Sequence, residues 1–286
     1  MRFGKPSANN APSKQKSSSN KVPVTTEIIS KHAKLPALVL VHGLGSAGSI
    51  WKTLHGGLED SFTIYPVDLP GHGSAPLHEE ELHPQALAHS IVRTMTDEHG
   101  IENFHVAGNS LGGWIALEMA ALFPDRVKSV TALAPAGLWQ EGPTQKFPPS
   151  LLARILAKIS QYFLTLAYRL PPLKALGYKK ITHLWRELSF ESCKDSVLAM
   201  ARSIGYSPMW KAMRHKKFES QIPEKIPVSI IFGDDDLTLP HPRAQVREVA
   251  PKHSRWIVVD NCAHVIMWNY PKLTVDLIKR TAFTPQ

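Results

Sequence analysis

Ser110 has the neighbours expected of a reactive serine, because glycines stand two residues before it and two residues after it. An apolar run at residues 104–107 leads into this segment, and an Ala- and Leu-rich helical pattern follows at residues 111–123. A strand that turns this sharply into a helix strains the residue at the turn, and only small neighbours let the two elements approach. The serine side chain is then exposed near the first amides of the helix. We therefore predict a nucleophile at Ser110; the alternative is a plain structural turn in which the serine caps the helix.

A serine hydroxyl becomes a strong nucleophile when a histidine removes its proton and a carboxylate holds that histidine in place. In a parallel sheet such groups lie in the loops beyond the carboxyl ends of the strands. Three consecutive aspartates, residues 234–236, follow a predicted strand at residues 227–232. His264 follows the next predicted strand, at residues 256–259. The chain thus offers a nucleophile, an acid and a base in that order.

The elements that must position these groups alternate between strand and helix along the chain. Apolar strands are expected at residues 36–41, 62–67, 104–107, 127–133, 227–232 and 256–259, with a marginal edge strand at residues 22–29. Helices are expected at residues 84–95, 111–123, 241–249 and 273–278. Continuous apolar strands are typical of a sheet buried on both faces. The alternation predicts an α/β fold with a mostly parallel central sheet and right-handed crossovers.

Two glycine-containing segments also follow predicted strands, His42-Gly43-Leu44-Gly45 and Asp68-Leu69-Pro70-Gly71-His72-Gly73. Together with the order Ser, Asp, His, these motifs resemble the α/β-hydrolase family over the chain from about residue 22 to its end. The resemblance implies an α/β-hydrolase fold, with helices flanking the sheet and an inserted helical lid. His42 and His72 are expected to shape turns and to hydrogen-bond rather than to catalyse.

The same resemblance assigns roles to individual residues. It makes Asp236, four residues before Pro240, the acid of a triad with Ser110 and His264, and it leaves Asp234 and Asp235 as capping or solvated neighbours. It also makes the backbone N–H groups of Leu44 and Leu111 the oxyanion hole, the donors that stabilise negative charge during acyl transfer.

The chain is expected to have four parts. Residues 1–21 form a polar, basic tail that we expect to be disordered. Residues 22–137 form the first part of the hydrolase core, and residues 218–286 form the second part. Residues 138–217, rich in proline, aromatic side chains and lysine, form the helical insert. In the family a lid commonly occupies this position, where it would cover Ser110 and select the substrate.

The formal net charge of +9 is unevenly distributed. The insert carries fourteen Lys and Arg against four Asp and Glu, whereas the core beyond the first 35 residues and outside the insert is net acidic. This distribution argues against a nucleic-acid partner. The basic excess has three interpretations: a solvated helix surface, a weak contact with an anionic membrane to which Lys216 and Lys217 would contribute, or attraction of an acidic substrate.

The two cysteines, Cys193 and Cys262, form no disulfide framework and no metal-type spacing. The sequence shows no standard secretion signal and no run of apolar residues long enough to span a membrane. We therefore expect a cytoplasmic protein, and no metal or cofactor is implied.

The predicted function is hydrolysis of carboxylic esters in small acyl substrates by a serine hydrolase, through an acyl-enzyme. Asn109 and the run at residues 109–113 also resemble hydrolases that cleave carbon–carbon bonds in meta-cleavage products, which is the alternative within the enzyme class. A serine nucleophile, where those enzymes use an aspartate, argues against epoxide hydrolase or dehalogenase activity. From another class, the alternative is a non-catalytic binding protein that keeps the fold.

Overall fold

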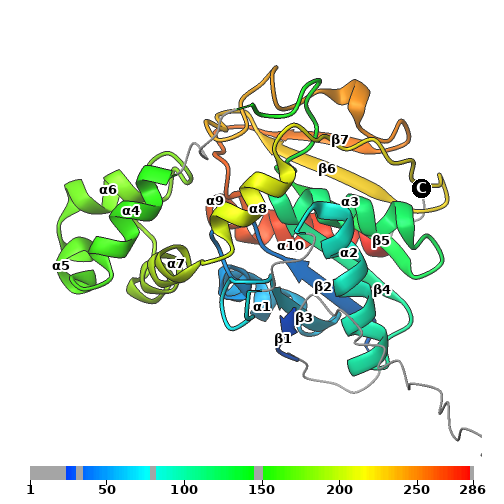
Figure 1. The fold of residues 1–286 in the computed structure, drawn as a ribbon, viewed down its shortest axis with the longest axis horizontal. Helices are drawn as coiled ribbons and strands as arrows, with labels where there is room; N and C mark the ends of the chain where they lie inside the picture. The colour runs from blue at the N-terminus through cyan, green and yellow to red at the C-terminus, as the bar shows by residue number, and fades with distance from the viewer. Residues whose placement is uncertain (1–23, 30–34, 78–81, 145–150, 284–286) are drawn as a thin grey trace, which may run out of the picture.

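A seven-stranded sheet with the strand order β1-β3-β2-β4-β5-β6-β7 forms the centre of the protein (Figure 1). The computed structural model describes residues 24–29, 35–77, 82–144 and 151–283. Strand β1 runs antiparallel to β3, and every other neighbouring pair of strands is parallel. The strands are β1 (Thr25–Thr26), β2 (Ala37–Val41), β3 (Thr63–Asp68), β4 (Phe104–Asn109), β5 (Val127–Leu133), β6 (Val228–Gly233) and β7 (Arg255–Val259).

The central strands are buried along almost their whole length. All five residues of β2 and all six of β6 are buried, as expected of a parallel sheet covered on both faces. In the parallel pairing, Val41 at the end of β2 lies opposite Gly108 in β4. Asn109 at the end of β4 lies opposite Leu133 at the end of β5. The carboxyl ends of β2, β4 and β5 therefore meet at one edge of the sheet.

Helices cover the sheet in two pairs on opposite faces (Figure 1). Helix α1 (Lys52–Leu58), which continues a 3-10 turn η1 (Gly48–Trp51), packs against α10 (Pro271–Phe283). Helix α2 (Pro84–Arg93) packs against α3 (Leu111–Leu122). Ten of the twelve residues of α3 are buried, so the helix that follows Ser110 lies in the core.

Five helices lie between β5 and β6 in the sequence. They are α4 (Leu151–Ser160), α5 (Leu164–Arg169), α6 (Pro171–Tyr178), α7 (Phe190–Arg202) and α8 (Tyr206–Met213). Helices α4 to α7 form a lobe to one side of the sheet, whereas α8 lies on the core (Figure 1). Within the lobe, α4 and α5 pack against α7, and α5 packs against α6.

The structure differs from the sequence expectations at the edge strand, at residues 241–249 and in the length of the last helix. The expected edge strand is reduced to β1 and one bridge between Ile29 and Ile64. The helix expected at residues 241–249 is absent from this described segment, which instead has turns and a 3-10 turn η3 (Arg247–Val249). One helical turn begins here, since the amide of Ala244 donates to the Pro240 carbonyl at 3.0 Å. The amide of Val246 then donates to the distant Leu138 carbonyl at 2.9 Å, and not to the Pro242 carbonyl that a helix would require, so the helix does not continue. The last helix, α10, is longer than predicted.

Three further expectations concern the tail, membrane-spanning helices and the cysteines. The tail predicted at residues 1–21 lies outside the described residues. Among the helices of the described ranges, none is both long and apolar enough to cross a membrane. Cys193 and Cys262 are both free and buried.

Glu118 in α3 binds the segment that connects α8 to β6. Its side chain is 1% exposed, and its Oε1 accepts a hydrogen bond of 3.0 Å from the indole nitrogen of Trp114. Its Oε2 accepts a 2.7 Å hydrogen bond from the hydroxyl of Ser220, which lies in the segment between α8 and β6. Both carboxyl oxygens of this buried group therefore have partners, as a buried polar group requires.

We predict that Glu118→Ala lowers the free energy of unfolding by about 2–3 kcal/mol, because two buried donors lose their acceptor. Glu118→Gln, which keeps one carbonyl acceptor, should lose less. Urea denaturation of the two variants and wild type measures both effects. An Ala variant as stable as wild type would show that these hydrogen bonds do not hold the segment that connects α8 to β6.

Candidate active site

Ser110 lies at the turn between β4 and α3 with a backbone conformation that few non-glycine residues adopt. Its φ of 57° and ψ of −118° place it outside the regions of strand and helix. The amide of Ser110 donates to the Leu133 carbonyl at 2.9 Å, and the amide of Ala136 donates to the Ser110 carbonyl at 2.9 Å. The end of β5 and the segment after it therefore hold this strained residue in place, and its side chain is partly exposed.

Glycines at this turn allow backbones to touch. A Cβ atom on Gly108 would lie 2.1 Å from the carbonyl oxygen of Gly112. A Cβ on Gly112 would lie 2.1 Å from the carbonyl oxygen of Val41 at the end of β2. Gly43, in the loop after β2, lies directly against the serine, since its Cβ would be 3.0 Å from that of Ser110. The expected strand, turn and helix are present, and a third backbone segment packs against them.

Asp236 and His264 form a buried hydrogen-bonded pair. The Nδ1 of His264 lies 2.7 Å from the Oδ2 of Asp236, and the two residues are 6% and 3% exposed. Asp236 follows β6 and His264 follows β7, which are neighbouring parallel strands. A Cβ on Gly233 would lie 2.0 Å from the Cys262 carbonyl oxygen, so the two loops are in contact. With its Nδ1 proton donated to Asp236, His264 has Nε2 free to accept a proton.

The environment of Asp236 favours its ionised form. Burial, the largest single cause, acts to raise the pKa of the carboxyl group, but the charge and hydrogen bond of His264 and two backbone hydrogen bonds together outweigh it, so the pKa is below its usual value. The amides of Thr238 and Leu239 add to this effect by donating to Oδ1 at 2.8 Å each. A carboxylate held in this way can fix the orientation of the histidine and stabilise its protonated form.

The other two aspartates of the loop have different contacts. Asp234 Oδ1 accepts a 3.0 Å hydrogen bond from the amide of Cys262, and this bond is the main cause of its lowered pKa. Asp235 is half-exposed and pairs with His183 Nε2 at 3.0 Å. Asp234 therefore caps the loop that carries His264, and Asp235 connects this loop to the segment after α6.

Two amides near Ser110 are candidates to bind an oxyanion. Among the described backbone hydrogen bonds outside helices and strands, neither Leu44 N nor Leu111 N is a donor. His42 controls the direction of the first, because its Nδ1 donates to the Gly43 carbonyl at 2.7 Å. In a trans peptide the C=O and the following N–H point in opposite directions, so the Leu44 N–H points away from His42. Leu111 N is the first amide of α3, directly after Ser110.

His42 and His72 bind the loops after β2 and β3 to one another. The Nε2 of His42 accepts from the Leu69 amide at 3.1 Å, and the Nε2 of His72 accepts from the Gly45 amide at 3.1 Å. Burial lowers the pKa of His42, and it lowers the pKa of His72 to about 3 with a further contribution from the nearby His42. Both rings are therefore neutral at pH 7 and able to accept these amides. The hydrogen-bonding role expected for them agrees with these contacts.

Asn109, which precedes the serine, is committed to backbone contacts. Its side-chain nitrogen donates to the Leu133 carbonyl at 3.1 Å and to the His264 carbonyl at 3.4 Å, and the residue is 3% exposed. These bonds brace the end of β4 against β5 and against the loop of His264. Asn109 therefore presents no group to a substrate. The alternative of carbon–carbon bond cleavage, which was inferred partly from Asn109, receives no support from this residue.

Sequence reasoning missed the contacts between the lobe and the residues after His264. Asn269 Oδ1, in α9 (Ile266–Asn269), accepts from the amide of His183 at 2.8 Å and from the hydroxyl of Thr182 at 3.3 Å. The amide of Val265 also donates to the Ile181 carbonyl at 2.9 Å. These partners are more than 80 residues apart in the chain, so no local pattern could reveal them. They hold the segment after α6 directly against the loop of His264.

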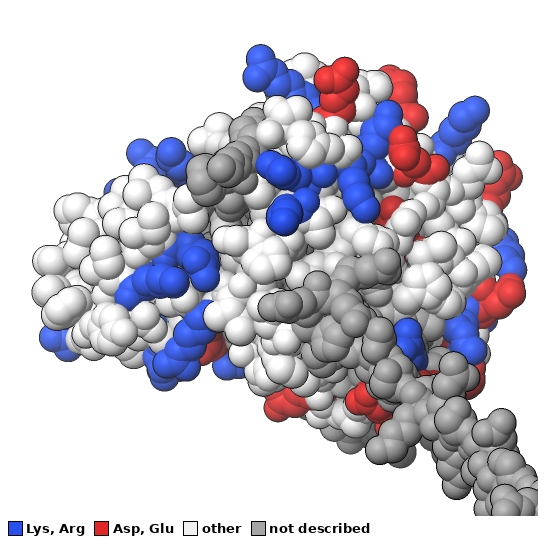
Figure 2. All heavy atoms as spheres, viewed as in Figure 1, with Lys and Arg blue, Asp and Glu red and all other residues white. Residues whose placement is uncertain are grey.

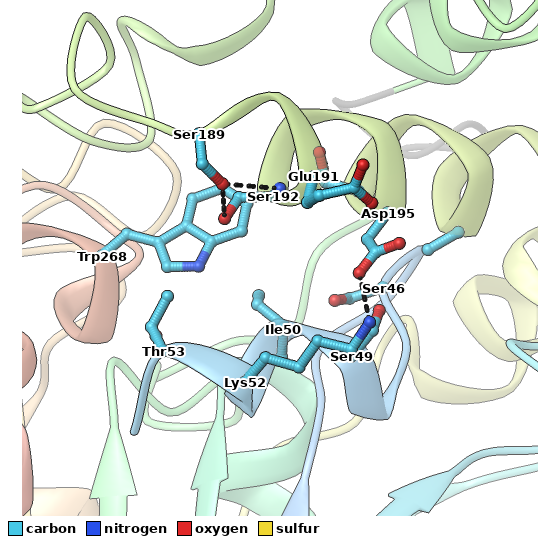
Figure 3. Close-up of a pocket in the computed structure, with 12 residues that line it drawn as sticks. Ser46, Ser49, Ile50, Lys52, Thr53, Ser189, Glu191, Ser192, Asp195 and Trp268 are labelled. Carbon is cyan, nitrogen blue, oxygen red and sulfur yellow. Dashed lines mark hydrogen bonds and ion pairs between the residues drawn. The ribbon is translucent and has the colours of Figure 1, made fainter. Parts of the chain in front are cut away.

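A cavity of about 260 Å³ lies between the core and the lobe, close to the loop after β2 (Figure 3). Ser46, two residues after Leu44, lines the cavity, and Trp268 of α9 lines another side of it. Serine hydroxyls from η1 and α7 surround it. Lys52 of α1 and Asp195 of α7 form a 2.6 Å ion pair across it, which joins the core to the lobe. The described residues contain no group of three or more His, Cys, Asp or Glu side chains that could hold a metal ion.

Comparison with known proteins defines the class to which this fold and site belong. A model of the alpha/beta hydrolase family matches residues 38–277. The chain therefore belongs to the alpha/beta hydrolase family, and it is a hydrolase. Its fold agrees with the fold class predicted from the sequence.

Individual relatives are distant but cover most of the chain. A pimeloyl-[acyl-carrier protein] methyl ester esterase of Aeromonas hydrophila is 23% identical over 85% of this chain and 94% of its own length. An uncharacterized protein of Mycobacterium tuberculosis is 24% identical over 86% of this chain and 74% of its own. Among solved structures, the enol-lactonase of Burkholderia xenovorans superposes with a TM-score of 0.68 at 18% identity, covering 90% of this chain and 95% of its own.

The buried histidines predict a loss of stability in mild acid. The pKa of His72 is about 3 in the folded protein and about 6.5 in the unfolded chain, so the unfolded chain binds more protons between these pH values. The free energy of unfolding should therefore fall as the pH decreases below 6.5, by about 1–2 kcal/mol from His72 alone between pH 6.5 and 5. Urea denaturation at a series of pH values measures this loss.

His72→Gln should weaken this pH dependence, whereas His89→Gln, a change at an exposed histidine of α2, serves as the matched control. An equal pH dependence in wild type and His72→Gln would contradict the assignment of His72 as a buried neutral acceptor.

Proposed function

We propose that the protein hydrolyses carboxylic esters, with Ser110 as the nucleophile, His264 as the general base and Asp236 as its orienting carboxylate. The observation that carries this proposal is the 2.7 Å hydrogen bond between His264 Nδ1 and Asp236 Oδ2, in a buried pair that the side chain of Asn109 links to the strained serine turn. A binding protein has no physical need for a buried carboxylate and histidine next to such a serine. The relative from Aeromonas hydrophila, a methyl ester esterase, also supports ester hydrolysis.

In the proposed mechanism, the Oγ of Ser110 attacks the ester carbonyl carbon while Nε2 of His264 takes its proton. The amides of Leu44 and Leu111 stabilise the negative oxygen of the tetrahedral intermediate. His264 then gives the proton to the leaving alkoxide, and an alcohol departs. A water molecule, activated in the same way by His264, hydrolyses the acyl-enzyme, and the carboxylic acid product leaves Ser110 free.

We also assign helices α4 to α8 the role of a lid. A Cβ on Gly45 would lie 2.7 Å from the sulfur of Met200 in α7 and 2.9 Å from the ring of Tyr206 in α8. The amide of Gly205 donates to the Gly71 carbonyl at 3.0 Å. The lid therefore touches the loops after β2 and β3, which border the proposed oxyanion hole.

The free thiols of Cys193 and Cys262 support our proposal that the enzyme works in the cytoplasm.

Two neighbouring aspartates provide a matched test of the proposed triad. Asp236→Asn should lower kcat on a short-chain aryl ester by about 10³–10⁴-fold, because His264 then loses its orienting carboxylate. Asp235→Asn, one residue away and half-exposed, should change kcat by no more than about threefold, since its partner is His183. Equal effects of the two changes would contradict the assignment of Asp236.

A vinylogous diketo acid assayed beside the aryl ester separates ester from carbon–carbon cleavage. Turnover of the ester is the expected result. Turnover of the diketo acid alone would favour the carbon–carbon hydrolase. If wild type, shown to be folded by circular dichroism, turned over neither compound, the non-catalytic binding protein would gain support.

We assign the cavity beside Ser46 to the part of the substrate that extends away from Ser110. Ala199→Phe on α7 should fill it, and should raise KM for long-chain aryl esters by about tenfold while leaving acetate esters almost unchanged. Ala153→Phe, an addition of the same size at an exposed position of α4, serves as the control. Equal changes for short and long esters, or none, would remove the cavity from the substrate path.

A further inference from the structure

The lobe exposes an unusual concentration of large apolar side chains. Of the seventeen large hydrophobic residues that are exposed in the described chain, ten lie between residues 152 and 176. We call these ten the apolar surface of the lobe. They are Leu152, Ile155, Leu156, Ile159, Tyr162, Phe163, Leu166, Leu170, Leu173 and Leu176. Such a concentration of exposed apolar side chains indicates an interaction site.

Helix α4 shows that this exposure is a property of a whole helix face. Leu152, Ile155, Leu156 and Ile159 follow one another at the spacing of a single helix face, with exposures of 66%, 47%, 36% and 58%. In a helix that packs on its own core this apolar face would point inward. Here the buried residue is Ala157, on the other side of α4, which packs against α7. The apolar face of α4 is thus turned away from the protein.

Positive charge accompanies the apolar surface, without any negative charge in the same stretch. Residues 151–186 contain seven Lys and Arg and no Asp or Glu. Five of these basic residues are exposed: Lys158, Arg169, Lys179, Lys180 and Arg186. Figure 2 shows this lobe as mostly uncharged surface with blue patches along it, while most of the acidic side chains on this face lie on the rest of the molecule.

The lysines singled out from the sequence lie elsewhere. Lys217 Nζ donates to the Gln140 carbonyl at 3.1 Å, and the Lys216 carbonyl accepts from the indole of Trp139 at 2.7 Å. Both residues follow α8 and lie against the segment that leaves β5, whereas the apolar surface belongs to α4, α5 and α6. The combination of apolar and basic side chains is therefore a feature of the lobe and not of Lys216 and Lys217.

We propose that the apolar surface of the lobe docks onto an anionic phospholipid bilayer. Its leucines, isoleucines and aromatic side chains would enter the boundary between headgroups and acyl chains, as the apolar faces of interfacial helices do. The exposed lysines and arginines would contact lipid phosphates, each adding attraction that weakens with salt. Long basic side chains can keep their charges at the headgroups while their methylene groups cover apolar surface.

Charge also argues against a second copy of the chain as the occupant. A symmetric dimer would bring the same surface of both copies together. Residues 151–186 would then face an identical set of positive charges with no carboxylate to pair them. An anionic lipid surface offers both an apolar interior and the complementary charge.

Vesicle flotation of the full chain tests this proposal with a matched pair of variants. Wild type should float with phosphatidylcholine vesicles that contain phosphatidylglycerol, and much less with phosphatidylcholine alone. The triple variant Leu152→Ser, Ile159→Ser, Leu166→Ser should reduce binding by about tenfold or more. The control variant Val258→Ser, Leu273→Ser alters other exposed apolar residues, on β7 and α10, and should bind as wild type does.

A second pair of variants tests the charge. Lys179→Glu with Lys180→Glu should remove the preference for phosphatidylglycerol, whereas Lys252→Glu with Lys272→Glu, on the core, should keep it. Circular dichroism of the same samples shows that each variant is folded. The proposal is overturned if wild type fails to bind the anionic vesicles, or if the lobe and core variants bind equally. It is also overturned if light scattering finds a dimer that the triple variant abolishes while vesicle binding is unchanged.

Discussion

Backbone contact at Ser110 is the constraint on which the rest of the site depends. Strand β4, helix α3 and the end of β2 approach so closely that a methyl group on Gly108 or Gly112 would overlap a carbonyl oxygen. This contact leaves Ser110 with a positive φ and puts its side chain beside Gly43 and the start of α3. The same packing places the loop of Leu44 and the first residue of α3, Leu111, next to the serine, so the proposed nucleophile and the proposed oxyanion hole depend on one packing arrangement.

Neighbouring loops extend this arrangement to the proposed acid and base. Gly233 lets the loop after β6 touch the loop after β7, and Asp236 and His264 meet across that contact. The loops after β2 and β3 are joined by His42 and His72, whose burial keeps them neutral and able to accept amide protons. Hydrogen bonds and close packing thus join the loops at the strand ends, and the lobe contacts these loops through Met200 and His183.

Local patterns predicted the fold well because strands and helices depend mostly on nearby residues. The apolar runs predicted every parallel strand, and the glycines around Ser110 predicted the turn between β4 and α3. The helix expected at residues 241–249 does not form because the amide of Val246 donates to the distant Leu138 carbonyl, a contact that has no local signal. The contacts of Asn269 with Thr182 and His183 join distant segments and have no local signal. The sequence showed the charge of the insert but not which face of α4 is exposed.

The most direct test of the central claim is to identify the residue that becomes covalently modified during reaction with an ester analogue. The folded protein would be treated with a fluorophosphonate, digested, and mapped by mass spectrometry. We predict one modified peptide, with the label on Ser110, and no labelling of Ser110→Ala or of heat-unfolded wild type. Absence of label on folded wild type, or equal labelling of Ser110→Ala, would contradict the claim that Ser110 is an activated nucleophile.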